Sequence, residues 1–380
     1  MRLPEPGLGV TRQRTGDSHQ DCPPWLLHQH EENGMDVIIG IDPHKSSHTA
    51  VAIDTTEQVL DQLRLVAGRR QLDQLLAFAE RWPDRRWAVE SAAGLGRLLA
   101  QQLVRAGEPV IDVPATLSAR VRLLSGGSAR KSDSHDARST AIAALHGKRL
   151  RPVTLEDTTV ILRMLADRRD HIAHERNRII CRIHNQFRHL RAGGAKTNLT
   201  ADQVARLLKG LRVDGVVDQH RRGLLRELLA DLRRVDRQLA DIDGRIRQAV
   251  TASDTTLTDI VGVGPVLAAV IIGHAGDMTR FPTRGHFASY AGTAPIEASS
   301  ADRSVHRLSR RGNRRLNAAI HLVALSQLSH DSAGRAYLQR RMAEGKTRRE
   351  AMRALKRQLS NVIYQHLLND ARRYSLDAAA

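Results

Sequence analysis

The sequence predicts an α/β domain followed by a longer, mostly helical region. Between residues 36 and 115, short apolar runs of strand length alternate with stretches of helical periodicity. From about residue 155, the apolar spacing is almost everywhere helical. At 380 residues, the chain is long enough for two or three domains, each with its own core. We therefore expect an α/β domain at 36–150, a helical middle region at 155–252 and a mostly helical C-terminal domain at 253–375.

Residues 1–34 lack both apolar periodicity and regularly spaced turn residues. The segment is polar and broken by prolines, a composition that buries too little apolar surface to fold, so we interpret it as a disordered leader. Met35 stands directly before the first strand-like run, which makes it an alternative start of the protein.

The α/β domain opens with three consecutive strand-like runs and continues with alternating helices and strands. In order, these are strands 36–44, 47–54 and 58–67, helix 69–82, strand 85–92, helix 94–107, strand 108–115 and helix 132–149. A three-stranded meander followed by strands that pair in parallel is the order of a ribonuclease-H-like domain.

Four acidic residues mark the ends and starts of these elements, at spacings of 48, 43 and 3 residues: Asp42, Glu90, Asp133 and Asp136. Asp42 and Glu90 each end an apolar run, and positions three apart on a helix share a face, so the four carboxylates can converge. Carboxylate oxygens are the ligands that Mg²⁺ prefers, and Mg²⁺ serves phosphodiester chemistry. Taken singly, each residue fits an ordinary strand end or helix cap. As a set they predict a Mg²⁺-binding, nuclease-like site, which His44 flanks.

The middle region predicts two long helices, at 158–187 and in the stretch before residue 252. Seven apolar residues of the second helix step by three and four residues, which is a heptad seam. They are Leu225, Leu228, Leu232, Val235, Leu239, Ile242 and Ile246. With the glycine-containing connection at 191–200, the pattern indicates either an antiparallel hairpin or a coiled coil that joins chains into a homo-oligomer. The simpler alternative is a helical spacer whose seam residues are buried within the same chain.

The C-terminal domain begins with a glycine turn between apolar stretches. Gly262 and Gly264 in IVGVGP resemble the hairpin of a helix-hairpin-helix element, in which backbone N–H groups at a helix start bind a phosphate. A plain turn between two buried helices would use glycine as well, so the motif alone is a weak signal.

The charge of the chain points to a polyanionic partner. The formal net charge is +18, and residues 301–360 hold 15 Arg and Lys against 4 acidic residues. Such clustering indicates nucleic acid, with a solvated basic face as the alternative. Six arginines at a helix start are expected to contact phosphates: Arg303, Arg307, Arg310, Arg311, Arg314 and Arg315. Aromatic residues make up only 3%, so base stacking is not the main mode of recognition.

Membrane and secreted classes do not fit this sequence. It has no apolar run of about 20 residues and no basic start followed by an apolar stretch. Cys22 and Cys181 are too few for a disulfide framework or a structural zinc site. These features predict a cytoplasmic protein that associates with the nucleoid and not with a membrane.

Several motifs, taken in order, resemble the IS-one-ten family of insertion-sequence transposases, the DEDD recombinases. The motifs are GIDPHK, VESAAG, KSDSHDA, IVGVGP, SYAGTAPIEASS and HRLSRRGNRRLN, and the resemblance covers about residues 36–370. It implies a RuvC-like N-terminal domain with the DEDD set, a coiled-coil connection and a C-terminal transposase domain with a catalytic serine. It also implies double-stranded DNA at the element ends and target as partner, a non-coding guide RNA, and a dimer or tetramer.

The serine of the family lies in a short Ser-Gly context. Its counterpart here is Ser300, preferred over Ser299, although Ala301 replaces the usual glycine. A hydroxyl is a poor nucleophile unless a base or a cationic site activates it. The leading hypothesis is therefore an RNA-guided DNA transposase. The alternatives are a RuvC-like junction endonuclease that uses metal-activated water alone, and an inactive relative that only binds nucleic acid.

Overall fold

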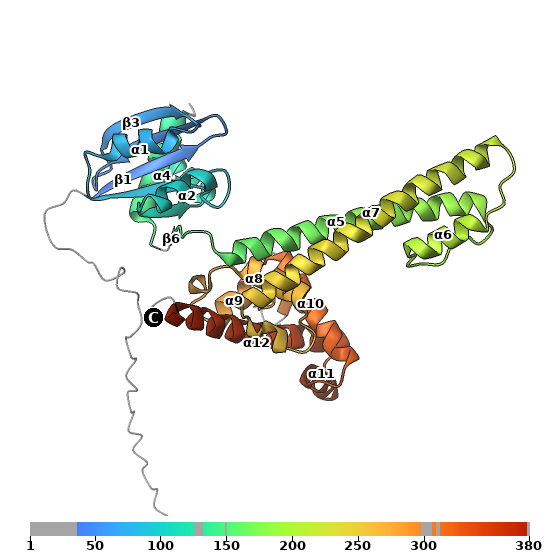
Figure 1. Ribbon diagram of the computed structural model, residues 1–380. Coiled ribbons are helices and arrows are strands. Elements are labelled where there is room, and N and C mark those ends of the chain that lie inside the picture. The colour runs from blue at the N-terminus through green and yellow to red at the C-terminus, as the bar shows by residue number, and fades with distance from the viewer. Residues whose placement is uncertain (1–35, 125–131, 149, 298–305, 309–311, 378–380) are drawn as a thin grey trace, which may run out of the picture. The chain divides into compact units, whose positions relative to one another are not determined.

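The computed structural model describes residues 36–124, 132–148, 150–297, 306–308 and 312–377 (Figure 1). The chain divides into two compact units, one ending at Leu155 and the other beginning at Glu156. The first is a mixed α/β unit and the second is almost entirely helical, which confirms the predicted fold class. The expected leader at 1–34 and the alternative start Met35 lie outside the described residues.

The first unit is built on a six-stranded sheet in the order β3-β2-β1-β4-β5-β6. Its strands are β1 (Val37–Pro43), β2 (Ser47–Ile53), β3 (Val59–Val66), β4 (Arg85–Glu90), β5 (Val110–Val113) and β6 (Arg151–Pro152). The first three form an antiparallel meander, β4 is parallel to β1, β5 is parallel to β4, and β6 is antiparallel to β5. This is the expected ribonuclease-H-like strand order.

Helices cover both faces of this sheet, so β1 is buried along its whole length. One face packs against α1 (Gln71–Ala79) and α2 (Arg97–Arg105) through residues such as Ile39 and Ile41. The other face packs against α3 (Ala115–Leu124) and α4 (Asp133–His146) through residues such as Ile38 and Ala88. The result is a three-layer α/β/α arrangement.

The sequence analysis did not predict α3. Two of its leucines, Leu123 and Leu124, are 81% and 87% exposed, whereas the polar Ser118 is buried at 3% exposure. Leu117 and Val121 pack against the core but are only partly buried. The apolar residues of α3 therefore lie on both its inner and its outer side, and periodicity arguments need them to gather on one side.

The second unit contains a long antiparallel hairpin of α5 (Thr158–Leu190) and α7 (Val216–Ala252), with α6 (Ala201–Lys209) at its far end (Figure 1). The seam residues Leu225, Leu232, Val235, Ile242 and Ile246 are buried, while Leu228 and Leu239 are partly buried. They share one core with four buried residues of α5: Ile172, Ile179, Ile183 and Phe187. The hairpin within one chain therefore satisfies the heptad seam.

The same core continues into the C-terminal helices. These are α8 (Pro265–Ala275), α9 (Arg284–Tyr290), α10 (Arg314–Ser329), α11 (Ala333–Ala343) and α12 (Arg348–Asp377), with short 3₁₀ turns η2 (Thr256–Asp259) and η3 (Met278–Arg280) and a β-ribbon of β7 (Pro295–Glu297) and β8 (His306–Leu308). Among the described helices, none is both long and apolar enough to cross a membrane.

The turn before α8 has a packing reason for one of its glycines. Gly262 has a φ of +90°, and a Cβ at this position would lie 2.9 Å from the Cβ of Ser326 in α10. Gly264 is the N-cap of α8, and a Cβ added there would meet no atom of the described residues within 4 Å. Close packing on α10 therefore accounts for Gly262, but not for Gly264.

Candidate active site

Asp42 and Glu90 occupy equivalent positions at the carboxyl ends of two neighbouring parallel strands. Ile41 of β1 pairs with Val89 of β4, so the next residue of each strand lies beside the other. Neighbouring strands are about 4.8 Å apart, and alternate side chains point to the same face. The two carboxylates therefore point to the face that α3 and α4 cover.

The start of α4 is brought over this strand end by a close contact with β1. A Cβ on Gly40 would lie 2.1 Å from the carbonyl oxygen of Ala137, so only glycine allows the helix to approach this far. Ser132 caps the helix by accepting a hydrogen bond from the backbone N–H of His135. Asp133 and Asp136 belong to the first turn of α4 and consequently lie next to the end of β1.

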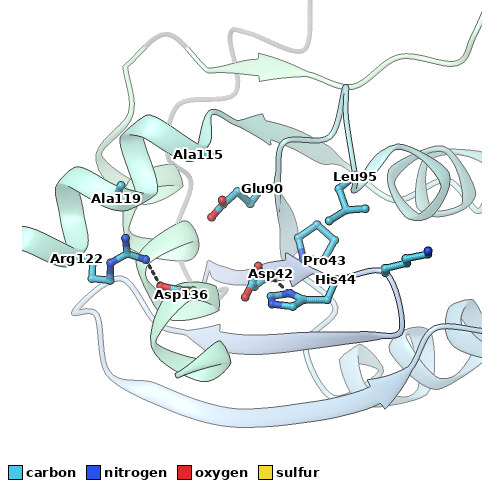
Figure 2. A pocket seen from close by; sticks show the side chains of 10 residues that line it. Asp42, Pro43, His44, Glu90, Leu95, Ala115, Ala119, Arg122 and Asp136 are labelled. Carbon is cyan, nitrogen blue, oxygen red and sulfur yellow. Dashed lines mark hydrogen bonds and ion pairs between the residues drawn. The ribbon is translucent and has the colours of Figure 1, made fainter. Parts of the chain in front are cut away.

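Asp42, Glu90 and Asp136 line one pocket with a volume of about 430 Å³ (Figure 2). The other lining residues are Pro43, His44, Lys45, Leu95, Ala115, Ala119 and Arg122. Asp133 lies beside this pocket, and its Oδ1 is 3.8 Å from Nε2 of His44. The other ring nitrogen of His44, Nδ1, is 3.5 Å from Oδ1 of Asp42. The structure thus brings all four predicted carboxylates together, and His44 contacts two of them.

Asp42 is the electrostatic centre of the cluster. It is only 7% exposed, and its Oδ2 has no hydrogen-bond partner among the described residues. Burial raises its pKa from 3.8 to about 6; the charges of Glu90, Asp136 and Asp133 also raise it, against the lowering effect of His44. A buried, unpartnered carboxylate oxygen among other carboxylates matches the donor set of a divalent cation. Ligand atoms of Asp42, His44 and Asp133 lie within 4.8 Å of one another, which also fits a metal ion.

Side chains that the sequence analysis missed hold this cluster in place. Thr140 Oγ1 lies 3.3 Å from Oε2 of Glu90, and Ser118 Oγ of α3 lies 3.1 Å from the same hydroxyl. Arg122 of α3 forms an ion pair with Asp136. Arg64 Nη2 of β3 lies 3.3 Å from Oδ2 of Asp133. These contacts depend on how β3 and α3 pack, and no motif in the sequence marks them.

The remaining predicted site residues are the candidate serines and the arginines of the C-terminal region. Ser299, Ser300, Arg303, Arg310 and Arg311 lie outside the described residues, as does the side chain of Arg307 in β8. Two arginines are described. Arg314 is exposed at the first position of α10, and Arg315 Nη1 lies 2.6 Å from Oδ2 of Asp170 in α5.

The first unit has a ribonuclease-H-like sheet, with carboxylates at the ends of β1 and β4 and at the start of α4. This combination defines a class of enzymes that cleave nucleic-acid phosphodiesters with a divalent metal. Comparison with known families specifies this class. A DEDD transposase model of IS110 elements matches residues 39–191, and the model of the transposase IS116/IS110/IS902 family matches residues 254–339. The chain belongs to the IS116/IS110/IS902 family of transposases, as its motifs predicted.

Two similar proteins of insertion elements match most of the chain, and a third matches about a third of it. An uncharacterized 44.8 kDa protein of insertion element IS116 from Streptomyces clavuligerus is 26% identical, over 89% of this chain and 96% of that protein. A 42 kDa protein of IS900 from Mycobacterium paratuberculosis is also 26% identical, over 87% and 96%. A 43.6 kDa protein of IS110 from Streptomyces coelicolor is 38% identical, over 37% of this chain and 35% of its own length.

Among solved structures, T. thermophilus RuvC in complex with a Holliday junction substrate matches 31% of this chain and 99% of its own length. The identity is 17% and the TM-score is 0.26. The assignment of the fold therefore depends on the strand order and on the family.

Proposed function

We propose that this transposase cuts and rejoins DNA at a divided site. One half is the carboxylate set Asp42, Glu90, Asp133 and Asp136, which would hold Mg²⁺. The other half is Ser300, the nucleophile. The observation that carries the proposal is the convergence of Asp42, Glu90 and Asp136 in one pocket, around a buried carboxylate oxygen that has no partner among the described residues.

The residues of the pocket suit a cation that acts on phosphates. A bound Mg²⁺ would neutralise charge at the reacting phosphate and make a nearby hydroxyl easier to deprotonate. The carboxylates bind the cation in their charged form. Burial raises the pKa of Asp42 to about 6, so this carboxyl is still mostly charged at neutral pH. Thr140 keeps Glu90 oriented toward the pocket, and the small side chains of Ala115 and Ala119 leave room in it.

The chemistry assigned to Ser300 is a transfer that conserves phosphoester bonds. The Oγ–P bond forms as one P–O ester bond of the DNA breaks, and the serine proton passes to solvent while the released DNA oxygen takes up a proton. The released oxygen of another cut strand then attacks the phosphoserine, so a new DNA ester forms as the Oγ–P bond breaks; the attacking hydroxyl loses its proton to solvent and the serine oxygen takes one up. Because each step exchanges one ester for another, strand exchange needs no ATP.

The proposed partners are double-stranded DNA at the element ends and target, a non-coding guide RNA, and further copies of the chain in a dimer or tetramer. The net charge of +18 and its concentration in residues 301–360 support a nucleic-acid partner. The proposed location of the protein is therefore the bacterial nucleoid. Phosphate contacts are assigned to the turn at Gly262 and Gly264 and to the arginine cluster (Arg303, Arg307, Arg310, Arg311, Arg314 and Arg315). The family resemblance supports the guide RNA and the oligomer.

The test is a search for a covalent protein–DNA adduct that resists denaturation, with the full chain, its guide RNA, Mg²⁺ and cognate DNA ends. Wild type is expected to form the adduct and Ser300→Ala to lose it while still binding DNA. Ser299→Ala is the matched control and should retain the adduct. Free 3′-OH and 5′-phosphate ends without any adduct in wild type would instead indicate a hydrolytic endonuclease.

The carboxylate half is tested separately in the same assay. Glu90→Gln and Asp136→Asn should each lower the cleavage rate at least about 100-fold, because each removes a negative ligand of the cation. Asp73→Asn is the control, since Asp73 is exposed on α1, which covers the opposite face of the sheet. Normal recombination by either pocket variant would show that the metal site is misassigned.

A further inference from the structure

Arg122 is a positive side chain inside the carboxylate pocket. It lies in the last turn of α3 and directs its guanidinium to Oδ1 of Asp136, as the dashed line in Figure 2 shows. The Asp136 side chain is 7% exposed and that of Arg122 is 38% exposed. The guanidinium thus reaches from the solvent side of the pocket to one of its buried carboxylates.

The surroundings of Arg122 are strongly negative. Its pKa is raised, first by the hydrogen bond and charge of Asp136 and further by the charges of Glu90 and Asp42. Three of the four carboxylates therefore attract the same guanidinium. Among the described residues it bonds only Asp136, however, and the buried Oδ2 of Asp42 has no partner there. Arg122 therefore offsets part of the repulsion between the carboxylates. The remaining negative charge is available to bind another cation.

An arginine at this place competes with a divalent cation. The Asp136 oxygen that accepts the guanidinium cannot also ligate a metal in the same direction, and two cations on one carboxylate repel each other. A guanidinium also forms paired hydrogen bonds with phosphate oxygens, which match its fork of N–H groups. The partial exposure of Arg122 leaves its side chain free to turn outward, to where a nucleic-acid backbone would enter the pocket.

We propose that Arg122 is an exchangeable cation: it neutralises Asp136 in the metal-free protein and moves to a nucleic-acid phosphate when a divalent metal occupies the carboxylates. The inference depends on the proposed metal site and adds a coupling to it. Metal binding releases the phosphate-binding group, and phosphate binding removes a competitor of the metal. Each ligand therefore strengthens the binding of the other by the same factor.

The first test measures Mn²⁺ binding to the full chain without nucleic acid, by electron paramagnetic resonance of free Mn²⁺. Arg122→Gln should bind Mn²⁺ about tenfold more tightly than wild type, which corresponds to the loss of one charge-assisted competitor. Arg120→Gln is the matched control, because Arg120 lies on the same helix, is exposed and does not line the pocket. Both variants lose one positive charge, so a general field effect would change them equally. Arg122→Lys keeps the charge and should stay closer to wild type.

The second test measures the affinity for duplex DNA by fluorescence anisotropy, with and without Ca²⁺. In wild type and Arg120→Gln, Ca²⁺ should strengthen DNA binding severalfold, and in Arg122→Gln this gain should be largely lost. Equal or weaker Mn²⁺ affinity of a folded Arg122→Gln protein would overturn the exchange at Asp136. If Arg122→Gln binds Mn²⁺ more tightly but Ca²⁺ still strengthens its DNA binding as much as in wild type, the proposed move of Arg122 to a phosphate is overturned. Absence of Mn²⁺ binding in every protein, wild type included, would instead overturn the metal site of the proposed function.

Discussion

Gly40 of β1 and Ala137 of α4 touch with no space for a side chain between them: a Cβ on Gly40 would lie 2.1 Å from the Ala137 carbonyl oxygen and 2.6 Å from the backbone nitrogen of Ala141. Asp136 directly precedes this contact, and Asp42 follows Gly40 by two residues on the same face of the strand. One glycine therefore determines how closely the helix and strand carboxylates approach.

Gly40→Ala should destabilise the first unit and separate the carboxylates. The clash is with backbone atoms, which a rotamer change cannot relieve, so we expect a loss of about 3 kcal/mol in the free energy of unfolding. Tryptophan fluorescence in a urea titration reports this unit, because the three tryptophans of the chain, Trp25, Trp82 and Trp87, precede residue 156. Gly68→Ala should stay within about 0.5 kcal/mol of wild type, since the nearest atom to its Cβ would be 4.0 Å away. A small effect at Gly40 would mean that α4 shifts freely on the sheet.

Asp42→Asn should stabilise the metal-free protein at neutral pH. The pKa of Asp42 is raised to about 6, so its protonated form stabilises the fold fully below about pH 4, and this contribution is lost as pH rises through 6. Asn has no charge to desolvate, and the variant should exceed wild type by on the order of 2 kcal/mol at pH 7.5 but not at pH 4. Thermal melts across this pH range test the difference, and a gap that stays constant with pH would contradict it. Added Mg²⁺ should raise the melting temperature of wild type only.

Thr140→Val should impair the site without removing a carboxylate. The Thr140 hydroxyl lies 3.3 Å from Glu90 Oε2 and 3.0 Å from the carbonyl oxygen of Asp136, so valine removes the group that orients Glu90. Loss of such a supporting contact typically lowers metal affinity or activity about tenfold. Thr140→Ser keeps the hydroxyl and should restore both values. Mn²⁺ titration and single-turnover cleavage measure them, and equal defects in the serine and valine variants would assign the effect to packing alone.

Arg314 and Arg315 should differ in their contribution to DNA binding although they are adjacent. Arg314 is exposed, so Arg314→Gln should weaken duplex binding and reduce the slope of log affinity against log salt by about 1. Arg315 is engaged by Asp170, with 45% of its side chain exposed, so Arg315→Gln should change the slope less. Anisotropy titrations at several salt concentrations provide the comparison. Identical slopes for the two variants would show that the Asp170 pair opens when DNA binds.

Local patterns were sufficient for most elements of the fold. The strands from β1 to β5 and the helices α1, α2 and α4 were predicted because apolar runs and helical spacing mark elements that bury one face. α3 was missed because its apolar residues lie on both sides of the helix: Leu117 and Val121 pack against the core, whereas Leu123 and Leu124 are exposed. The heptad seam predicted a partner helix, but only the structure identifies α5 of the same chain as that partner.

The sequence by itself identified the four carboxylates of the candidate site, because carboxylates at strand ends and in the first turn of a helix are visible in the order of the chain. The tertiary structure decided how they act on one another. The pairing of Ile41 with Val89 and the contact at Gly40 bring the carboxylates together, and burial raises the pKa of Asp42. Arg122 joins them through the packing of α3 on α4, a contact between helices that local sequence patterns do not encode.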